Sequence, residues 1–178
     1  MAHSSGTRSD VRASTARLLW TGLAVLVADQ AVKRLVVALM ALGDSVEVLG
    51  PAVRITRTEN TGAAFGLFRG GGAVFVVVSA LASVCIIALS RRIARLRRVE
   101  QLAFALVLGG ALGNLVDRVR HGAVVDFIDI GIRDLRWPAF NVADSAIVIG
   151  VALLAARFLL FPHRSEPAEL PARDGDAS

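Results

Sequence analysis

The chain has 178 residues, of which 54% are hydrophobic and 20% charged, and its mean hydropathy of +0.60 excludes a disordered or fibrous protein. The net charge of +5 is compatible with a nucleic-acid partner, but the chain has no Tyr and two Trp, so it offers no aromatic platform for bases. Because residues 70–90 contain no Asp, Glu, Lys, Arg or His, we expect a membrane protein instead.

Apolar segments that are long enough to cross a bilayer as helices occur four times along the chain. They cover about 18–40, 71–89, 101–117 and 145–161. Polar residues precede the first segment and follow the last, so we expect disordered cytoplasmic tails at 1–17 and 162–178. Asp29-Gln30 interrupts the first segment and no cleavage site follows it, which favours a retained helix over a cleaved signal peptide.

The distribution of arginine predicts the orientation of these segments. The N-terminal tail, the connection 91–98 and the C-terminal end from Arg157 hold 11 Arg, whereas the longer connections 41–70 and 118–140 hold seven. Short flanks rich in Lys and Arg stay on the cytoplasmic side of a membrane. We therefore expect both termini in the cytoplasm and the two longer connections outside it.

The first outer connection is predicted to contain a short β-hairpin. Residues 46–49 and 53–57 alternate apolar and polar side chains, and Gly50-Pro51 separates the two stretches. We expect this hairpin to lie on the outer membrane surface, beside the outer ends of the helices.

Polar residues that a bilayer disfavours gather at the outer ends of the predicted helices. Asp29 and Lys33 lie four residues apart, as an ion pair on one helix face requires. Asn114, Asp117 and Arg118 end the third helix, and Asn141 and Asp144 introduce the fourth. An Asp at the centre of a bilayer costs about 2.5 to 3.5 kcal/mol, so these residues indicate a functional site.

Asp126 and Asp144 can meet if the connection between the third and fourth helices folds back. Two carboxylates at a low-dielectric boundary tend to share one proton, so that one acts as a base towards water and the other as an acid towards a carbonyl oxygen. Amides such as Asn60, Asn114 and Asn141 can orient the acids without adding charge. This pattern is typical of aspartic proteases.

The residues alone leave other roles open. Asn141 or Asp144 is also a good helix cap. Asp129 is the strongest rival of Asp126 for a catalytic position, and His121 lies close enough in sequence to both to mimic a metal cluster. No further His stands at ligand spacing, which disfavours a metal site.

Two other classes of function also remain open. Asp29, Asp126 and Asp144 could relay protons in a small transporter, or the polar residues could serve only helix packing, with Asp117-Arg118 as a structural ion pair. A relay needs ionisable groups through the depth of the membrane, and the second segment has none.

Five strings in chain order carry a family resemblance. They are Asp29-Gln30 with Lys33, Glu59–Gly66 (ENTGAAFG), Gly109–Arg118 (GGALGNLVDR), Val124–Ile128 (VVDFI) and Phe140–Ala146 (FNVADSA). Together they resemble the lipoprotein signal peptidase family, also called signal peptidase II, over about residues 18–160. The resemblance implies an all-α integral membrane protein, with four transmembrane helices and a small extracytoplasmic β-rich cradle.

The resemblance also implies an activity and its residues. The activity is that of an aspartic endopeptidase of the bacterial inner membrane, which needs no metal or other cofactor. Its partners are membrane lipids and prolipoproteins, which it cleaves on the N-terminal side of a cysteine bearing a diacylglyceryl group. The motifs place catalysis on Asp126 and Asp144, in preference to Asp129. Positions that support the site or bind substrate are Asp29, Lys33, Asn60, Asn114, Asp117, Arg118 and Asn141.

Overall fold

The computed structural model describes residues 8–62, 72–133 and 135–160. The elements are α1 (Arg8–Leu39), β1 (Ser45–Leu49), β2 (Val53–Asn60), α2 (Gly72–Ile93), α3 (Arg98–His121), β3 (Val124–Ile132), β4 (Leu135–Arg136) and α4 (Val142–Leu160). Three predicted segments lie outside the described residues: residues 1–7 of the N-terminal tail predicted at 1–17, the C-terminal tail predicted at 162–178, and residues 63–66 of the second motif string.

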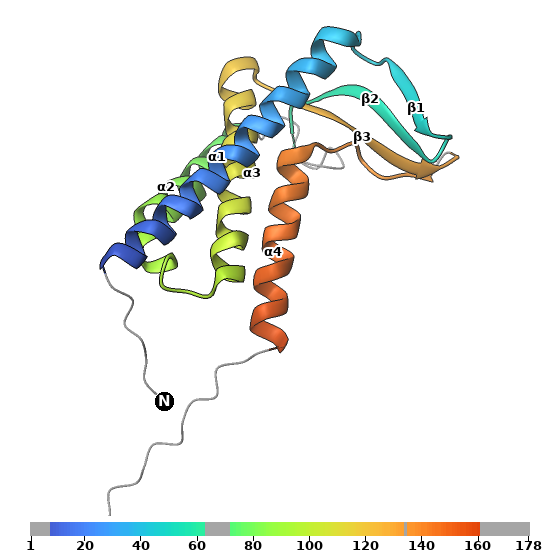
Figure 1. The fold of residues 1–178 in the computed structure, drawn as a ribbon. Coiled ribbons are helices and arrows are strands. Elements are labelled where there is room, and N and C mark those ends of the chain that lie inside the picture. The colour runs from blue at the N-terminus through green and yellow to red at the C-terminus, as the bar shows by residue number, and fades with distance from the viewer. Residues whose placement is uncertain (1–7, 63–71, 134, 161–178) are drawn as a thin grey trace, which may run out of the picture.

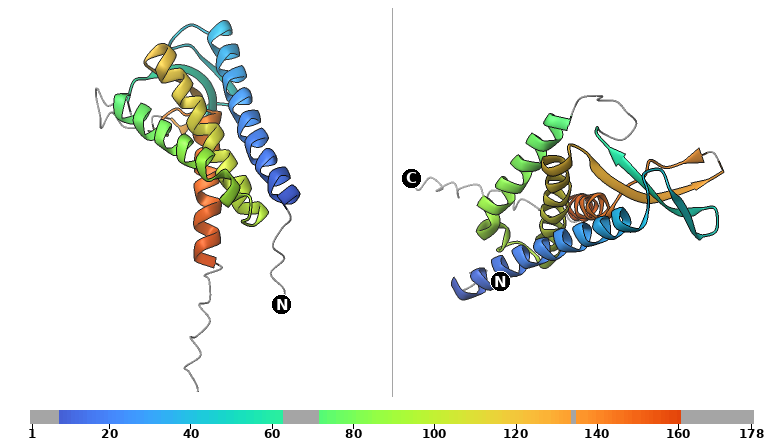
Figure 2. Two further views of the ribbon diagram at one scale, coloured as in Figure 1. Left: turned by 90° about the vertical axis from the view of Figure 1, so that its left-hand side faces the viewer. Right: turned by 90° about the horizontal axis from the view of Figure 1, so that it is seen from above.

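Helix α3 lies at the centre of the helical part, where it packs against α1, α2 and α4 (Figures 1 and 2). Glycines allow this close approach. A Cβ atom on Gly109 would lie 2.5 Å from the backbone oxygen of Gly22 in α1, and one on Gly113 would lie 2.6 Å from Oδ2 of Asp29. Small residues at helix interfaces let backbones come this close, so the spacing of Gly109 and Gly113 serves helix packing.

A four-stranded antiparallel sheet in the order β1-β2-β3-β4 covers one end of the helices (Figure 1). The predicted hairpin is confirmed as β1 and β2, which pair Val46 with Ile55. Strand β3, in which Asp126 pairs with Thr58 of β2, was not predicted from the sequence. The all-α class therefore needs correction: the chain has four helices and a small sheet, and the sheet carries one of the two candidate acids.

Three of the helices in the described part of the chain are long and apolar enough to cross a membrane, by length and composition alone: α2, α3 and α4. Helix α1 is not among them, because it carries Asp29, Lys33 and Arg34 within its apolar stretch. It also begins at Arg8, so residues 8–17, expected in a disordered tail, are helical. That stretch contains no Gly or Pro and is rich in Ala and Arg, which favour helix.

The two ends of the helical part carry different kinds of side chain. The last turns of α1 and α3 and the first turn of α4 meet the sheet at one end (Figure 1). The first turns of α1, the connection between α2 and α3, and the last turns of α4 lie at the other. The polar motif residues belong to the first end and most of the arginines to the second.

Candidate active site

A buried ion cluster joins α1 to α3. Nζ of Lys33 lies 2.9 Å from Oδ2 of Asp29 and 2.8 Å from Oδ2 of Asp117, and it donates a third hydrogen bond to Oδ1 of Asn114 at 3.1 Å. The exposed fractions of Lys33, Asp29 and Asp117 are 3%, 0% and 4%. All three ammonium protons therefore have an acceptor, which a buried cation requires. The predicted ion pair between Asp29 and Lys33 is confirmed.

The first turn of α4 is held by two side chains. Oδ1 of Asn141 accepts the backbone N–H of Asp144 at 2.8 Å, and Oδ1 of Asp29 accepts that of Ala143 at 2.9 Å. These bonds satisfy amides that a helix leaves without an internal partner. Asn141 is thus the cap of α4, and Asp29 fixes this helix to α1.

Asp126 is brought to α4 by backbone pairing with the segment that precedes the helix. The N–H of Ile128 donates to the carbonyl oxygen of Phe140 at 2.8 Å, and the N–H of Phe140 donates back to Ile128 at 3.1 Å. The connection between α3 and α4 therefore folds back, as predicted, and it places β3 beside the first turn of α4.

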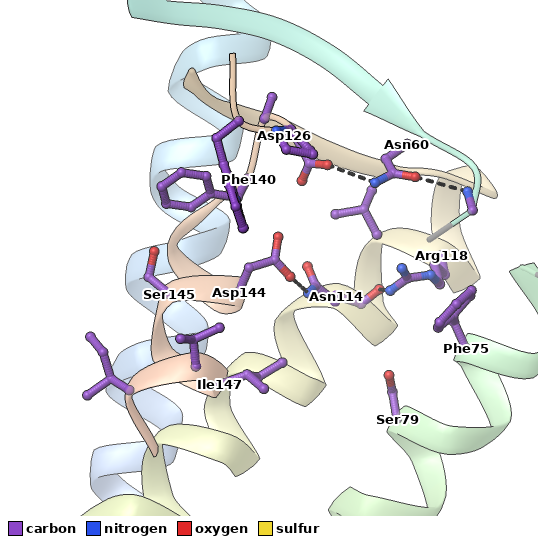
Figure 3. A pocket seen from close by; sticks show the side chains of 17 residues that line it. Asn60, Phe75, Ser79, Asn114, Arg118, Asp126, Phe140, Asp144, Ser145 and Ile147 are labelled. Carbon is purple, nitrogen blue, oxygen red and sulfur yellow. Dashed lines mark hydrogen bonds between the residues drawn. The ribbon is translucent and has the colours of Figure 1, made fainter. Parts of the chain in front are cut away.

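Neutral amides hold both candidate acids (Figure 3). Asp126 accepts hydrogen bonds from Nδ2 of Asn141 at 2.6 Å and from Nδ2 of Asn60 at 3.1 Å. Asp144 accepts one from Nδ2 of Asn114 at 2.7 Å. Since Asn114 also accepts a hydrogen bond from Lys33, this amide links the buried ion cluster to the carboxylate of Asp144.

The two carboxylates face one cavity of about 630 Å³ (Figure 3). Its polar lining includes both acids together with Asn60, Asn114 and Arg118, and the remaining wall is mostly apolar. The apolar part of the wall comprises Phe75, Val124, Trp137, Pro138, Ala139, Phe140, Ile147, Val148 and Ile149. The cavity thus offers an apolar surface for a ligand with two carboxylates at one side.

The pKa of Asp126 is raised to about 6, first by burial of the carboxyl group and second by the negative charge of Asp144. The hydrogen bonds from Asn60 and Asn141 oppose this rise, because they stabilise the ionised form, and the positive charge of Lys33 acts in the same sense. A carboxyl group with such a pKa can both hold and release a proton near neutral pH.

Arg118 lines the cavity and lies over the ring of Phe75, with Cζ 5.3 Å from the ring centroid. Its Nη1 donates to the backbone oxygen of Asn114 at 3.4 Å. Asp117 instead pairs with Lys33, so within the described ranges the Asp117-Arg118 ion pair that was left open is not formed. Although they are adjacent in sequence, Asp117 belongs to the buried ion cluster and Arg118 lines the cavity.

Asp129 lies away from this cavity. Its Oδ1 atom is 2.6 Å from Nε of Arg136, and its Oδ2 atom accepts a hydrogen bond from Thr56 at 3.0 Å. Both carboxylate oxygens of Asp129 are therefore paired with side chains of the sheet, Arg136 of β4 and Thr56 of β2. Among the residues that the structure describes, no group of three or more His, Cys, Asp or Glu side chains could hold a metal ion, and this includes His121.

Comparison with known proteins identifies the family. The sequence model of the family described as "Signal peptidase (SPase) II" matches residues 21–160. The chain belongs to the signal peptidase II family. Curated relatives named "Lipoprotein signal peptidase" include one from Moorella thermoacetica, 44% identical over 80% of this chain and 92% of the relative, and one from Geobacter sulfurreducens, 43% identical over 82% and 92%.

Two solved structures of bacterial membrane enzymes share the fold of this chain. One, titled "Bacterial membrane enzyme structure by the in meso method at 2.3 A resolution", has a TM-score of 0.76 and 33% identity, over 87% of this chain and 94% of its own. A second bacterial membrane enzyme has a TM-score of 0.72 and 34% identity, over 83% and 94%. The fold described above is therefore that of a membrane enzyme.

Sequence reasoning missed some residues of this signal peptidase II site. Nε2 of Gln30 donates to Oδ1 of Asp117 at 2.8 Å and to the backbone oxygen of Gly113 at 3.3 Å, so it completes the buried cluster. Gln30 could have been predicted as a member of the cluster, because it is a polar residue beside Asp29 in an otherwise apolar segment. Phe75 and Ile147 gave none, because apolar residues occupy most positions of their helices.

Proposed function

We propose that the chain is a membrane aspartic endopeptidase that removes the signal peptide from prolipoproteins, cleaving on the N-terminal side of a cysteine that bears a diacylglyceryl group. One observation carries the chemical part of this proposal. The carboxylates of Asp126 and Asp144 come from a strand and a helix, face the same cavity, and are each held by a neutral amide. Membership of the signal peptidase II family supports the choice of substrate.

The two acids act on a water molecule and the scissile carbonyl. The ionised carboxyl group accepts a proton from water as the water oxygen attacks the carbonyl carbon, and the protonated group donates its proton to the carbonyl oxygen. The tetrahedral intermediate then collapses: the C–N bond breaks, the proton taken from water moves to the leaving amine, and one hydroxyl proton of the intermediate returns to the acid that had donated it. Asn60, Asn114 and Asn141 keep both acids in place, which reduces the reorganisation that the reaction needs.

The chain crosses the membrane four times in this proposal, with both termini in the cytoplasm and the sheet outside. The polar residues of α1 support its membrane span, because Asp29 and Lys33 are buried against α3 and α4. Its exposed positions Leu19, Leu23 and Val27 repeat every four residues and present an apolar face to lipid. The signal helix of the substrate enters the apolar part of the cavity while its acyl chains stay in the bilayer.

The test is cleavage of a diacylated prolipoprotein by the purified chain and its Asp126→Asn and Asp144→Asn variants. Each variant is expected to lose about 10²- to 10⁴-fold in kcat, since each removes one partner of the acid–base pair. Asp129→Asn is the matched control, because it makes the same change in the same strand outside the cavity, and it is expected to keep most of the activity.

Cleavage that persists in both variants would contradict the roles of the two acids. Equal processing of a substrate without the diacylglyceryl group would contradict the proposed lipoprotein specificity. Loss of activity on adding a chelator would contradict a mechanism that uses the two acids and water alone.

A further inference from the structure

The first turns of α1 and the connection between α2 and α3, which lie at the end of the helices opposite the sheet (Figure 1), are rich in arginine. This end carries eight exposed arginines: Arg8, Arg12, Arg17, Arg91, Arg92, Arg95, Arg97 and Arg98. The nearby Glu100 is already engaged, because Oε2 accepts the backbone N–H of Arg97 at 2.8 Å and Oε1 lies 3.6 Å from Nε of Arg157. Asp10, in the first turn of α1, is the other carboxylate of residues 8–17 and 91–100. Eight arginines therefore face two carboxylates, and the excess of positive charge favours an anion from outside the chain.

A second cavity, of about 310 Å³, lies within this basic end, between α1 and α3. It is remote from the candidate active site and shares no lining residue with it. Its lining residues are Arg17, Leu18 and Thr21 from α1, and Arg98, Gln101, Leu102 and Ala105 from α3. The family match begins at residue 21, so the part of α1 that supplies Arg17 precedes the matched region.

The lining of this cavity changes from charged to apolar along the helices. Arg17 and Arg98 occupy the turns nearer the basic end, and Ala105 lies two turns further along α3. Leu18 and Ala105 are almost fully buried, at 2% and 1% exposed, whereas Leu102 is 46% exposed at the side. The cavity therefore combines a cationic end, an apolar floor and an apolar side open to its surroundings.

Arg17 and Arg98 are the cationic groups in the lining of this cavity. Nε2 of Gln101 already donates to the backbone oxygens of Ala94 and Leu96. Within residues 8–62, 72–133 and 135–160, neither Arg17 nor Arg98 takes part in an ion pair. Guanidinium groups bind phosphate oxygens through paired N–H donors, and two of them from different helices can hold one phosphate.

We propose that this cavity binds one anionic phospholipid, with its phosphate between Arg17 and Arg98 and the start of an acyl chain against Leu18, Leu102 and Ala105. The apolar floor favours a lipid over a free phosphate ion, which would leave that surface unused. Trp20 supports the same choice, since it is 69% exposed one turn from Arg17, and Trp is enriched at membrane interfaces. The lipid ties α1 to α3 at the end remote from catalysis.

The test measures lipid binding to the intact chain, purified in detergent and freed of endogenous lipid, by native mass spectrometry. Phosphatidylglycerol is titrated against the parent chain, the Arg17→Gln/Arg98→Gln variant, and a matched Arg91→Gln/Arg95→Gln control that removes the same charge from the same end outside the cavity. The parent is expected to bind one phosphatidylglycerol with a Kd about tenfold lower than that of the cavity variant. The control is expected to bind within about twofold of the parent.

Two further arms separate the possible ligands. Phosphatidylcholine, whose headgroup is zwitterionic, is expected to bind about tenfold more weakly than phosphatidylglycerol, and inorganic phosphate is not expected to displace the bound lipid. Equal weakening in the Arg91→Gln/Arg95→Gln control would overturn the proposal in favour of diffuse surface attraction. Displacement by inorganic phosphate, equal binding of phosphatidylcholine, or no stoichiometric lipid on the parent chain would each overturn it as well.

Discussion

The two amides on Asp126 control the pH range in which this residue is ionised. Because the bond from Asn60 stabilises the carboxylate, Asn60→Ala is expected to raise the pKa of Asp126 above its value of about 6. If catalysis needs one ionised acid, the acidic limb of the kcat/KM profile then moves to higher pH. Thr58→Ala is the matched control on the same strand, since Thr58 donates to the backbone oxygen of Asp126 and not to its carboxylate. Coincident acidic limbs for the two variants would argue against this control of the pKa.

The raised pKa of Asp126 also predicts a pH-dependent cost to stability. The unfolded chain ionises this carboxyl near pH 3.9 and the folded chain near 6, so the folded state loses stability as pH rises through this interval. Asp126→Asn removes that cost, which is about 3 kcal/mol at most and is fully present above pH 6. We expect the variant to unfold at a higher temperature than the parent at pH 8, and the difference to shrink towards pH 4.

A parallel measurement on Asp129→Asn provides the contrast. This substitution removes an ion pair with Arg136, so it is expected to give no gain in unfolding temperature at pH 8. A gain at pH 8 that is equal in the two variants, or one for Asp126→Asn that persists unchanged at pH 4, would contradict the argument from ionisation.

At the level of whole elements, the closest packing joins α3 to α4. A Cβ atom on Gly110 would meet the backbone oxygen of Ala143 and lie 2.7 Å from Cγ1 of Ile147. Gly110→Ala therefore pushes the first turn of α4 away from α3, at a cost of about 1–3 kcal/mol. Because Asp144 lies in that turn and bonds to Asn114 of α3, we expect kcat to fall along with the unfolding temperature.

The control for this packing is Gly72→Ala. A Cβ atom there has its nearest neighbour, the backbone oxygen of Thr61, at 3.5 Å, which is ordinary contact. It is expected to leave both stability and kcat close to those of the parent. Equal losses in the two variants would indicate that helical glycines matter here for a reason other than the α3–α4 distance.

The helices were largely predictable because their signal is local. Helices α2, α3 and α4 follow long, mainly apolar runs, and their observed bounds lie within about four residues of the predicted ones. The first turns of α1 were missed, since a polar helical stretch at a chain end has no apolar run to reveal it. Strand β3 was missed for a different reason: it depends on pairing with β2, more than 60 residues earlier in the chain.

The candidate site shows the same division between local and distant information. The motif strings named Asp126 and Asp144, and the spacing of Asp29 and Lys33 predicted their ion pair. The prediction that Asn60, Asn114 and Asn141 orient the acids is confirmed. Which amide bonds to which acid was not predictable, because Asn60 reaches Asp126 only through the register of β2 against β3. The double role of Asn141, as cap of α4 and donor to Asp126, likewise needs the three-dimensional arrangement.

Across the whole molecule, the Lys33 cluster connects helix assembly to the candidate acids. It joins α1 to α3 through Asp117, holds α4 through Asp29, and reaches Asp144 through Asn114. Lys33→Met leaves two carboxylates buried without their cation, which is expected to destabilise the chain by about 3–5 kcal/mol. Arg34→Met is the matched control, because Arg34 is the adjacent residue and is exposed.

A triple variant separates the structural from the chemical role of this cluster. Asp29→Asn and Asp117→Asn, added to Lys33→Met, remove the unpaired negative charges, so most of the lost unfolding temperature is expected to return. Activity is expected to stay low, because Oδ1 of Asn114 keeps only the 3.3 Å bond from Asn141 and loses the shorter bond from Lys33 that helps to fix this amide against Asp144. Recovery of full kcat together with stability would show that Lys33 only assembles the helices and does not position the acids.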